Sequence, residues 1–274
     1  MARPKLRSRT KKIAYVNQKG GVGKSTYALY VAEAAANLGA RVLVRDLDPQ
    51  GNVTLSLALE PGEYTMNDVL KPDEETGEVV PGSLGSAIRE SGELWPKTLF
   101  GVPATLALAS REGDSGPEVH VPRERRLQIV SEGALDPFDL VVTDCPPNVG
   151  QLTINGLADS DEAYVVTVPA LWALQGTHEA YRTITRVQKY YNPGLQFGGL
   201  WVNQFFPTRV ESKARLAELR ANENYAGKVL DPQMNYMEGV GRATGAMSPL
   251  STYGPEAAEA ASAFETIAKR ALDI

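Results

Sequence analysis

The 274 residues suffice for one large domain or two small ones, and 43% of them are hydrophobic against 22% charged, which predicts a soluble globular protein with a sizeable core. This balance excludes a disordered chain. No apolar run approaches the roughly 18 residues of a membrane span, and the first residues show no pattern typical of a secretory signal. One cysteine and two histidines exclude an internal disulfide and leave little for a zinc centre, so we expect a cytoplasmic protein.

The net charge of −5 is spread unevenly along the chain. Residues 1–12 carry a local charge of +6, and subtracting this from −5 leaves −11 on the remainder. We therefore predict a basic, flexible arm over residues 1–11 and a single domain over residues 12–274. Such an arm can contact nucleic acid or an anionic surface, or it can be a solvated leader. Its charges are Arg3, Lys5, Arg7, Arg9, Lys11 and Lys12.

Strand and helix patterns alternate after the arm. In chain order, the patterns predict a strand at 13–16, a helix at 25–38, strands at 41–44, 138–143 and 163–168, a helix at 172–191, a strand at 195–202, and helices at 209–222 and 255–272. Gly39 stands just after the first helix, where a C-terminal glycine cap belongs. This alternation predicts an α/β fold with a doubly wound, mostly parallel sheet flanked by helices.

Residues 60–125 break this regularity. They are rich in Gly, Pro and Glu, with short helical segments predicted near 83–91 and 122–133. We interpret them as surface excursions from one domain. The last predicted helix carries a stripe of mostly alanine, which favours packing on the body of the protein over insertion in lipid.

A glycine-rich loop lies between the first predicted strand and the first predicted helix. It runs Gln18-Lys19-Gly20-Gly21-Val22-Gly23-Lys24-Ser25-Thr26. Its glycines let backbone N–H groups surround a polyphosphate, and the helix N-terminus adds a partial positive charge. Lys24 is expected to reach the β- and γ-phosphates, and the Ser25 hydroxyl to ligate Mg²⁺. The loop departs from the usual P-loop pattern at its first position, where Gln18 replaces glycine.

A second lysine, Lys19, precedes Lys24 by five residues. Because Lys24 already serves the phosphates of its own loop, Lys19 needs another anionic partner. One solution points Lys19 across a dimer interface at the nucleotide of the other subunit, where it would neutralise charge that develops during phosphoryl transfer, as an arginine finger does. The alternative is an exposed, solvated lysine.

Carboxylates end two of the predicted strands. Asp46 and Asp48 follow the second strand, and Asp144 ends the third. Ligands of such sheets bind beyond the C-terminal ends of the strands, and buried carboxylates need a cation or hydrogen-bond donors. Mg²⁺ and its water ligands supply both. We therefore expect a magnesium ion near these acids and the Ser25 hydroxyl, with Asp46 in its outer coordination sphere.

These motifs resemble those of the ParA/MinD superfamily. Lys19 to Ser25 is similar to its deviant Walker A motif, and Asn17-Gln18 resembles the ParA branch. The resemblance covers most of residues 12–205 and implies a ParA-type partition ATPase with a P-loop NTPase fold. It continues in the family's order through Asp46-Leu47-Asp48-Pro49-Gln50-Gly51-Asn52, Asp144-Cys145-Pro146-Pro147, Leu152-Thr153-Ile154-Asn155-Gly156-Leu157 and Ala173-Leu174-Gln175-Gly176.

The resemblance implies roles for single residues. Asp144 corresponds to the Walker B acid, which holds Mg²⁺ through water, and Asp48 to the residue that positions the attacking water. Since a carboxylate with a pKa near ~3.9 is a weak base, we expect Asp48 to orient the water more than to abstract its proton. Asn203, at the end of the strand at 195–202, corresponds to an asparagine that reads the adenine edge, which implies ATP over GTP. The alternative is a turn asparagine.

The same resemblance implies a basic surface that binds DNA. Arg209 and Arg242 are the first candidates for DNA binding, because they fall where the family's basic surface lies. The segment 231–236 lacks the arginines often found there in chromosomal ParA proteins, so those positions cannot be carried over one by one. Arg45 occupies a strand position that is usually apolar in the family, and we expect it to pair with an acid or to cap the sheet edge. Further basic candidates, for which a solvated helix face is the alternative, are Lys213, Arg215 and Arg220.

The resemblance as a whole implies a weak, switch-like ATPase. ATP and Mg²⁺ would join two subunits into a homodimer, with Lys19 of each chain reaching across, and this dimer would bind non-specific DNA through phosphate contacts. A ParB-type partner would stimulate hydrolysis, and the cycle would serve plasmid or chromosome partition on the bacterial nucleoid. Positioning of another cargo, such as a microcompartment or a chemoreceptor cluster, stays open because only the partner would differ.

Three other classes of protein are alternatives to a ParA-type ATPase. A MinD-like membrane switch is an alternative, although the last helix offers little apolar bulk, so we expect no membrane partner. An electron-donating iron protein needs a four-thiolate bridge between subunits, which one cysteine cannot build. A non-enzymatic DNA-binding module would require a degenerate site, whereas every expected phosphate and metal group is present.

Overall fold

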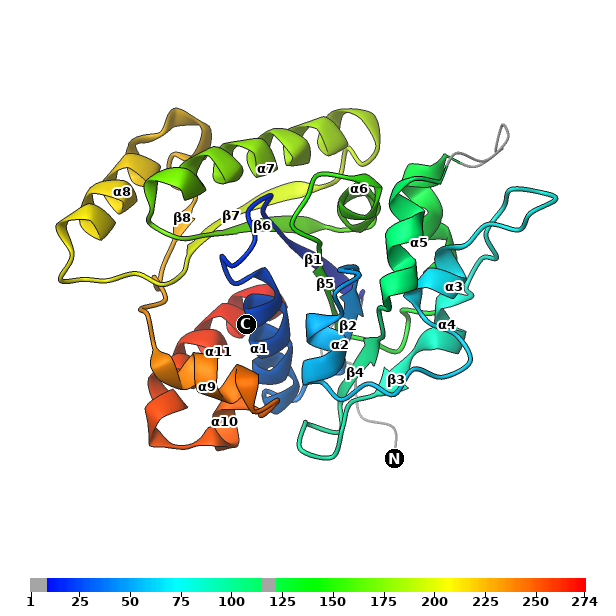
Figure 1. Ribbon diagram of the computed structural model, residues 1–274, viewed down its shortest axis with the longest axis horizontal. Helices are drawn as coiled ribbons and strands as arrows, with labels where there is room; N and C mark the ends of the chain where they lie inside the picture. Colours follow the sequence, from blue (N-terminus) through cyan, green and yellow to red (C-terminus); the bar gives the residue numbers. More distant parts are fainter. Residues whose placement is uncertain (1–8, 115–121) are drawn as a thin grey trace.

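A single mixed sheet of eight strands runs through the part of the chain that the structure describes (Figure 1). This computed structural model describes residues 9–114 and 122–274. The strand order is β3-β4-β2-β5-β1-β6-β7-β8, and all pairs are parallel except β3 with β4. The predicted doubly wound, mostly parallel sheet is therefore confirmed. The strands are β1 (Lys11–Val16), β2 (Val42–Asp46), β3 (Arg89–Glu90), β4 (Leu99–Val102), β5 (Leu140–Asp144), β6 (Glu162–Thr167), β7 (Gln196–Val202) and β8 (Val229–Leu230).

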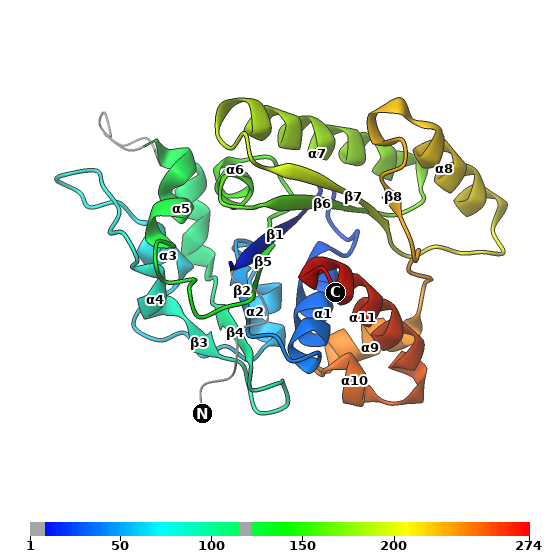
Figure 2. The ribbon, with the colours of Figure 1, turned by 180° about the vertical axis from the view of Figure 1, so that it is seen from behind.

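Helices cover both faces of this sheet (Figures 1 and 2). The helices α6, α7 and α8 pack on one face, and α1 and α11 pack on the other. Among the described residues, no helix has the length and apolar character needed to cross a membrane. The α-helices are α1 (Lys24–Asn37), α2 (Asn52–Ser56), α3 (Met66–Leu70), α4 (Leu84–Ala87), α5 (Arg126–Val130), α6 (Gln151–Ala158), α7 (Leu171–Tyr190), α8 (Val210–Ala221), α9 (Glu238–Gly245), α10 (Leu250–Tyr253) and α11 (Ala258–Leu272). Short 3₁₀ helices span Leu106–Glu112, Arg123–Arg125, Glu223–Tyr225 and Pro255–Ala257.

The helix α1 carries the glycine-rich loop at its start and packs against α11. Gly39 follows α1 in the left-handed region at φ 101°, which confirms the predicted cap. The rings of Tyr27 and Tyr30 meet Phe264 of α11 at centroid distances of 5.2 and 5.6 Å. Aromatic pairs of this kind contribute about 0.5–1.5 kcal/mol each beyond the burial of area. The C-terminal helix thereby supports the helix that bears the loop.

Arg45 is buried within the sheet and forms an ion pair. Its guanidinium lies 2.5 Å from the Asp159 carboxylate and donates to the Thr143 hydroxyl at 2.8 Å. Lys12 contributes a second cation to the same carboxylate. Of the two roles predicted for Arg45, the structure thus shows the pairing with an acid, which removes the cost of burying a lone charge.

The basic arm lies mostly outside the described residues. Residues 1–8 belong to that undescribed part, so their flexibility is not tested. Arg9 pairs with Asp161 at 2.9 Å, and Lys11, already within β1, is buried and pairs with Glu162 at 2.9 Å. The last charges of the arm are therefore anchored to the domain.

The segment 60–125 is where the sequence patterns mislead most. The predicted helix at 83–91 is wrong beyond Ala87, because β3 follows it and pairs with β4. The strand β4 itself was not predicted, and it pairs in parallel with β2 inside the main sheet. This segment thus extends the sheet and does not consist of surface excursions alone.

Candidate functional site

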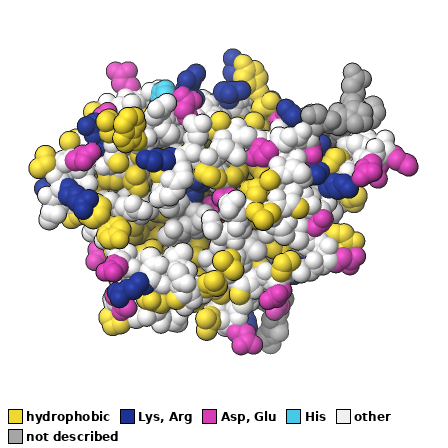
Figure 3. Space-filling model, in the orientation of Figure 1, with side chains coloured by type: hydrophobic (Ala, Val, Ile, Leu, Met, Phe, Trp, Pro, Cys, Tyr) yellow, Lys and Arg dark blue, Asp and Glu magenta, His cyan; other side chains and the backbone are white. Residues whose placement is uncertain are grey.

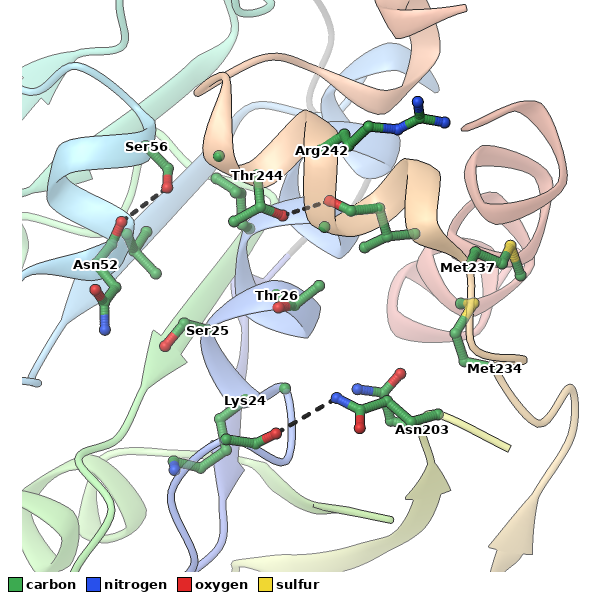
Figure 4. Close-up of a pocket in the computed structure, with 18 of the residues that line it drawn as sticks. Lys24, Ser25, Thr26, Asn52, Ser56, Asn203, Met234, Met237, Arg242 and Thr244 are labelled. Carbon is green, nitrogen blue, oxygen red and sulfur yellow. Dashed lines mark hydrogen bonds between the residues drawn. The ribbon is translucent and has the colours of Figure 1, made fainter. Parts of the chain in front are cut away.

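A cavity of 810 Å³ opens at the start of α1, between the glycine-rich loop and α9 (Figure 4). Its volume falls in the range of about 300–1,000 Å³ that is typical of small-molecule sites. Figure 4 shows Lys24, Ser25 and Thr26 on one side of this space and Asn203, Met234 and Met237 on another. The structure therefore brings together residues that are separated by about 180–210 positions in the sequence.

The glycine-rich loop owes its path to two glycines with left-handed backbones. Gly21 has φ 75° and Gly23 has φ 102°, conformations that other residues adopt at a steric cost. A Cβ atom on Gly23 would lie 2.2 Å from the Asn203 side-chain nitrogen. That nitrogen donates a hydrogen bond to the Val22 carbonyl at 2.9 Å. Asn203 thus sits directly on the loop and lines the cavity, whereas the buried Val22 side chain does not.

Lys24 is a buried cation at the base of the loop. Its ammonium nitrogen lies 3.4 Å from the Lys19 carbonyl oxygen, and burial lowers its pKa, while Asp144 and Asp48 act in the opposite direction. An anionic ligand in the cavity would compensate this burial. The predicted phosphate contact of Lys24 is consistent with this position.

Asp46 is the last residue of β2, and its side chain is hydrogen-bonded to the helix α2. Its carboxylate accepts hydrogen bonds from the backbone N–H and hydroxyl of Thr54, at 2.9 and 2.8 Å, and from the Asp48 N–H at 3.1 Å. Burial raises the pKa of Asp46, these hydrogen bonds lower it, and the resulting pKa is about 6. The Thr54 hydroxyl also accepts from the Ala104 N–H at 2.9 Å. Because its oxygens are engaged in this way, Asp46 is left with little capacity to ligate a metal ion directly, and its predicted outer-sphere role stays a prediction.

Asp144 is the opposite case. It is fully buried at the end of β5, and neither carboxylate oxygen has a hydrogen-bond partner among the described residues. Burial and the nearby Asp46 raise its pKa well above the usual value, whereas Ser25 and Lys24 lower it. An unpartnered buried carboxylate indicates a cation site. The residues present therefore fit a Mg²⁺ ion.

Protein side chains alone do not complete the donor set for such an ion in the described part of the chain. Among the described residues, no three His, Cys, Asp or Glu side chains are grouped closely enough to hold a metal ion. A magnesium ion beside Asp144 would take further oxygens from the Ser25 hydroxyl, from water and from the phosphates of a ligand, as is usual for Mg²⁺. Metal and nucleotide are therefore expected to bind together.

Asp48 and Lys19 lie on opposite sides of the loop. Asp48 faces the cavity, and Lys19 lies beside α7. Asp48 lines the cavity and accepts the Gln50 N–H at 3.0 Å. Lys19 is half-buried, its backbone N–H donates to the Asn17 side chain at 2.9 Å, and its ammonium group has no ion pair within the described part of the chain. Lys19 does not line the cavity of its own protomer.

The helix α7 packs closely on this loop. A Cβ atom on Gly176 would lie 2.8 Å from the Asn17 oxygen and 3.3 Å from the Lys19 Cβ atom, which explains the glycine of the motif at 173–176. Leu171 and Trp172 begin α7 beside this contact, and 78% of the Trp172 surface is exposed. An exposed apolar pair therefore begins the helix that packs on the loop carrying Lys19.

Several residues of the site were missed by the sequence analysis. Thr54 links Asp46 to the backbone of Ala104 but belongs to no recognised motif. Glu112 accepts the Gln151 N–H at the start of α6 at 2.5 Å, although it comes from the irregular segment. Tyr236 lines the cavity from a loop that follows β8. None of these carries a local signal, because each acts on an element distant in the sequence.

The candidate DNA contacts are exposed. The Arg209 guanidinium lies 3.7 Å from the centroid of the Phe206 ring. Arg242 lies on α9 with 54% of its side chain exposed and has a long ion pair with Glu256, at 3.9 Å; Figure 4 shows it pointing away from Lys24. Arg215 and Arg220 form ion pairs with acids, at 2.5 and 3.2 Å, which reduces their availability to a further anion. Figure 3 shows basic side chains over α7 and α8.

Comparison with known proteins places this site in a family. The AAA_31 family, described as an AAA domain, matches residues 10–197. The chain is 34% identical over 190 residues to the sporulation initiation inhibitor protein Soj of Bacillus subtilis, covering 69% of this chain and 70% of the relative. It is 30% identical over 262 residues to the chromosome-partitioning ATPase Soj of Treponema pallidum, covering 94% and 96%.

A solved structure of similar fold was determined with a nucleotide and magnesium bound. Cobyrinic acid a,c-diamide synthase from Mycobacterium smegmatis, with bound ADP and magnesium, is 28% identical with a TM-score of 0.75, covering 95% of this chain and 93% of that chain. The family match spans the glycine-rich loop and all three acids at the strand ends. The chain therefore belongs to the Soj/ParA family of partition ATPases.

Proposed function

We propose that this protein is an ATP-driven switch that dimerises around two nucleotides, binds DNA of any sequence in its ATP state, and releases it after hydrolysis during plasmid or chromosome partition. The observation that carries the proposal is the convergence of Lys24, Ser25 and Asp48 in one cavity beside the unpartnered carboxylate of Asp144. The Soj relatives and the neighbour with bound ADP and magnesium support ATP and Mg²⁺ as its ligands.

Within the site, each side chain has a distinct task. Lys24 and the backbone N–H groups of residues 20–25 bind the phosphates. Ser25 and Asp144 hold Mg²⁺, which when bound supplies positive charge to the phosphate oxygens. Asp48 orients the attacking water, and its place on the cavity wall suits this task. Asp46 keeps α2 in position through its hydrogen bonds to Thr54.

Dimerisation gives Lys19 its partner. Among the described residues its ammonium group forms no ion pair, and Lys19 does not line the cavity of its own protomer, which supports a role toward the other subunit. Leu171 and Trp172 offer apolar surface next to it. Removal of the γ-phosphate would weaken the contact between the subunits, so hydrolysis would separate them.

DNA binding in this proposal is electrostatic. Arg209 and Arg242 are exposed cations that would contact phosphates, so affinity should fall as salt rises. Such binding would place the protein on the bacterial nucleoid, and a ParB-type partner would stimulate hydrolysis there. The basic arm at residues 1–11 would add to the same attraction.

The decisive experiment measures DNA binding with ATP, with ADP and without nucleotide over a salt series. We expect binding only with ATP, with a steep salt dependence. Equal binding in all three states would overturn the switch. Lys24→Ala should abolish nucleotide binding, and Asp48→Ala should retain a DNA-bound ATP state because hydrolysis stops.

Lys19→Ala tests the contact between subunits. It should bind ATP but stay monomeric in sedimentation velocity, whereas Lys97→Ala, which removes an exposed lysine outside the cavity, should dimerise like the wild type. Dimerisation of Lys19→Ala at wild-type strength would remove the contact across the interface from the proposal.

A further inference from the structure

A continuous stack of side chains runs from the wall of the nucleotide cavity to the candidate DNA contact Arg209. Tyr236 lines the cavity, and its ring is stacked on Phe206 with a centroid distance of 5.1 Å and an interplanar angle of 19°. On Phe206 lies the Arg209 guanidinium, 3.7 Å from the ring centroid. The stack therefore connects a ligand site with a surface cation through direct contacts.

The backbone holds this stack in place. The Phe205 N–H donates to the Met234 carbonyl at 2.9 Å, and the Tyr236 N–H donates to the Phe205 carbonyl at 3.0 Å. These bonds join the loop after β7 to the loop after β8, so that Phe206 and Tyr236 are presented side by side. The spacing between the two rings is thus fixed by the fold.

We propose that Tyr236 is the stacking platform for the base of the bound nucleotide, and that the stack through Phe206 couples the base to the position of Arg209. The inference rests on the proposed function, because it takes the ligand to be a nucleotide. Tyr236 keeps 56% of its surface exposed although it lines the cavity, so it has area available for a planar ligand. An aromatic ring of this kind favours a base.

The remaining wall of the cavity suits a purine. Met234 and Met237 lie next to Asn203 in Figure 4 and add polarisable apolar surface. The Asn203 amide nitrogen is bonded to Val22, and its side-chain oxygen has no partner in the part of the chain described here, so it is available to accept from an amino group of a base. A ring platform and an edge acceptor therefore face one space.

The far end of the stack suits a phosphate. A guanidinium that lies flat on a ring keeps its N–H edge free, and Arg209 is exposed at the start of α8. Among the described residues it has no ion pair. A shift of Tyr236 upon base binding would be passed to Phe206 and hence to the Arg209 side chain.

The platform is tested by comparing ATP with inorganic tripolyphosphate, a ligand with phosphates and no base, in calorimetric titrations with Mg²⁺. Tyr236→Ala should weaken ATP binding roughly tenfold, the value of one lost base–aromatic stack, and leave tripolyphosphate binding unchanged. Tyr236→Phe should bind both ligands like the wild type. The matched control is Tyr190→Ala, which removes a 63% exposed tyrosine outside the cavity and should change neither affinity.

Two results would overturn the platform. Equal losses for ATP and tripolyphosphate in Tyr236→Ala would show that the ring supports the loop and not the base. Unchanged ATP affinity would show that the base binds elsewhere. Both readouts are made without DNA, so they decide the platform even if the chain binds no DNA in any nucleotide state, a result that would overturn the Arg209 coupling and the proposed function together.

The coupling is tested on DNA in the presence of ATP. Phe206→Leu keeps apolar bulk but removes the ring, and at saturating ATP it should lower DNA affinity by the same factor as Arg209→Ala. The double variant should lose no more than Arg209→Ala alone. Multiplied losses in the double variant would overturn the coupling.

Discussion

Replacing Asp144 by asparagine should stabilise the ligand-free protein while it destroys metal binding. The Asp144 carboxylate is fully buried, and the Ser25 hydroxyl, which lowers its pKa, can donate to an amide oxygen as well as to a carboxylate, so Asp144→Asn keeps this donor. An unsatisfied buried polar group costs about 1–3 kcal/mol, and more when it is charged. Asparagine is still polar but carries no charge, so we expect the free energy of unfolding to rise by about 1 kcal/mol where wild-type Asp144 is ionised, equivalent to about 2–4 °C in Tm.

The gain must depend on pH in a defined direction. Because burial raises the folded-state pKa of Asp144 above its unfolded value, its contribution to wild-type stability is fully present below the unfolded pKa and is lost as the pH rises through the folded pKa. The difference between Asp144→Asn and the wild type should therefore be large at pH 8 and small near pH 4. Urea unfolding with EDTA, at both values, measures it.

Replacing a second buried acid is the control, because it should change the free energy of unfolding in the opposite direction. Asp159 is paired with Arg45 and Lys12, so Asp159→Asn should destabilise the ligand-free protein by about 3–5 kcal/mol. ATP and Mg²⁺ should then stabilise the wild type, by about 2.7 kcal/mol at a hundredfold excess over Kd, but should leave Asp144→Asn unchanged. A loss of stability in ligand-free Asp144→Asn, or an equal gain at both pH values, would refute the reasoning.

Three further outcomes follow from the packing of the site. Gly23→Ala should lower ATP affinity, measured by titration, and reduce the free energy of unfolding by about 1–2 kcal/mol, because residue 23 has a left-handed backbone and its Cβ atom would meet Asn203. Gly20→Ala, whose Cβ atom would meet nothing within 4 Å, should keep wild-type stability. Cys145 is buried with a raised thiol pKa, so a thiol reagent at pH 8 should label it only after urea is added, and rapid labelling of the native protein would contradict this. Thr54→Val should lower the free energy of unfolding in urea by about 1–3 kcal/mol, because the Asp46 carboxylate would lose the hydrogen bond from the Thr54 hydroxyl. An unchanged urea midpoint would argue against a stabilising role of this hydrogen bond.

The parts of the fold that were predictable are those whose signals are local. The glycine-rich loop requires the left-handed glycines 21 and 23, and this requirement is written in consecutive residues. The central strands are continuous apolar runs that end at polar residues, so Asp46 and Asp144 could be assigned to one edge of the sheet before their distance in space was known. The register of β2 with β5 indeed sets these two acids opposite each other.

The parts that were not predictable depend on partners far along the chain. The strand β4 has only four residues, and what makes it a strand is its parallel pairing with β2. The role of Arg45 could not be decided in advance, because Asp159 reaches it from the end of α6. Tyr236 belongs to no recognisable motif. The β-bridge between Phe205 and Asn235 places it at the cavity. Local patterns contain none of this information.

The contact between α1 and α11 has a consequence for biosynthesis. The helix that follows the phosphate-binding loop ends at Asn37, whereas the helix that buries Tyr27 and Tyr30 begins only at Ala258 and is therefore translated much later. Closing a loop of this length is slow compared with local helix formation. Until α11 has been synthesised, the side of α1 that it covers therefore lacks its packing partner, and the nucleotide cavity lacks Phe264, which lines it.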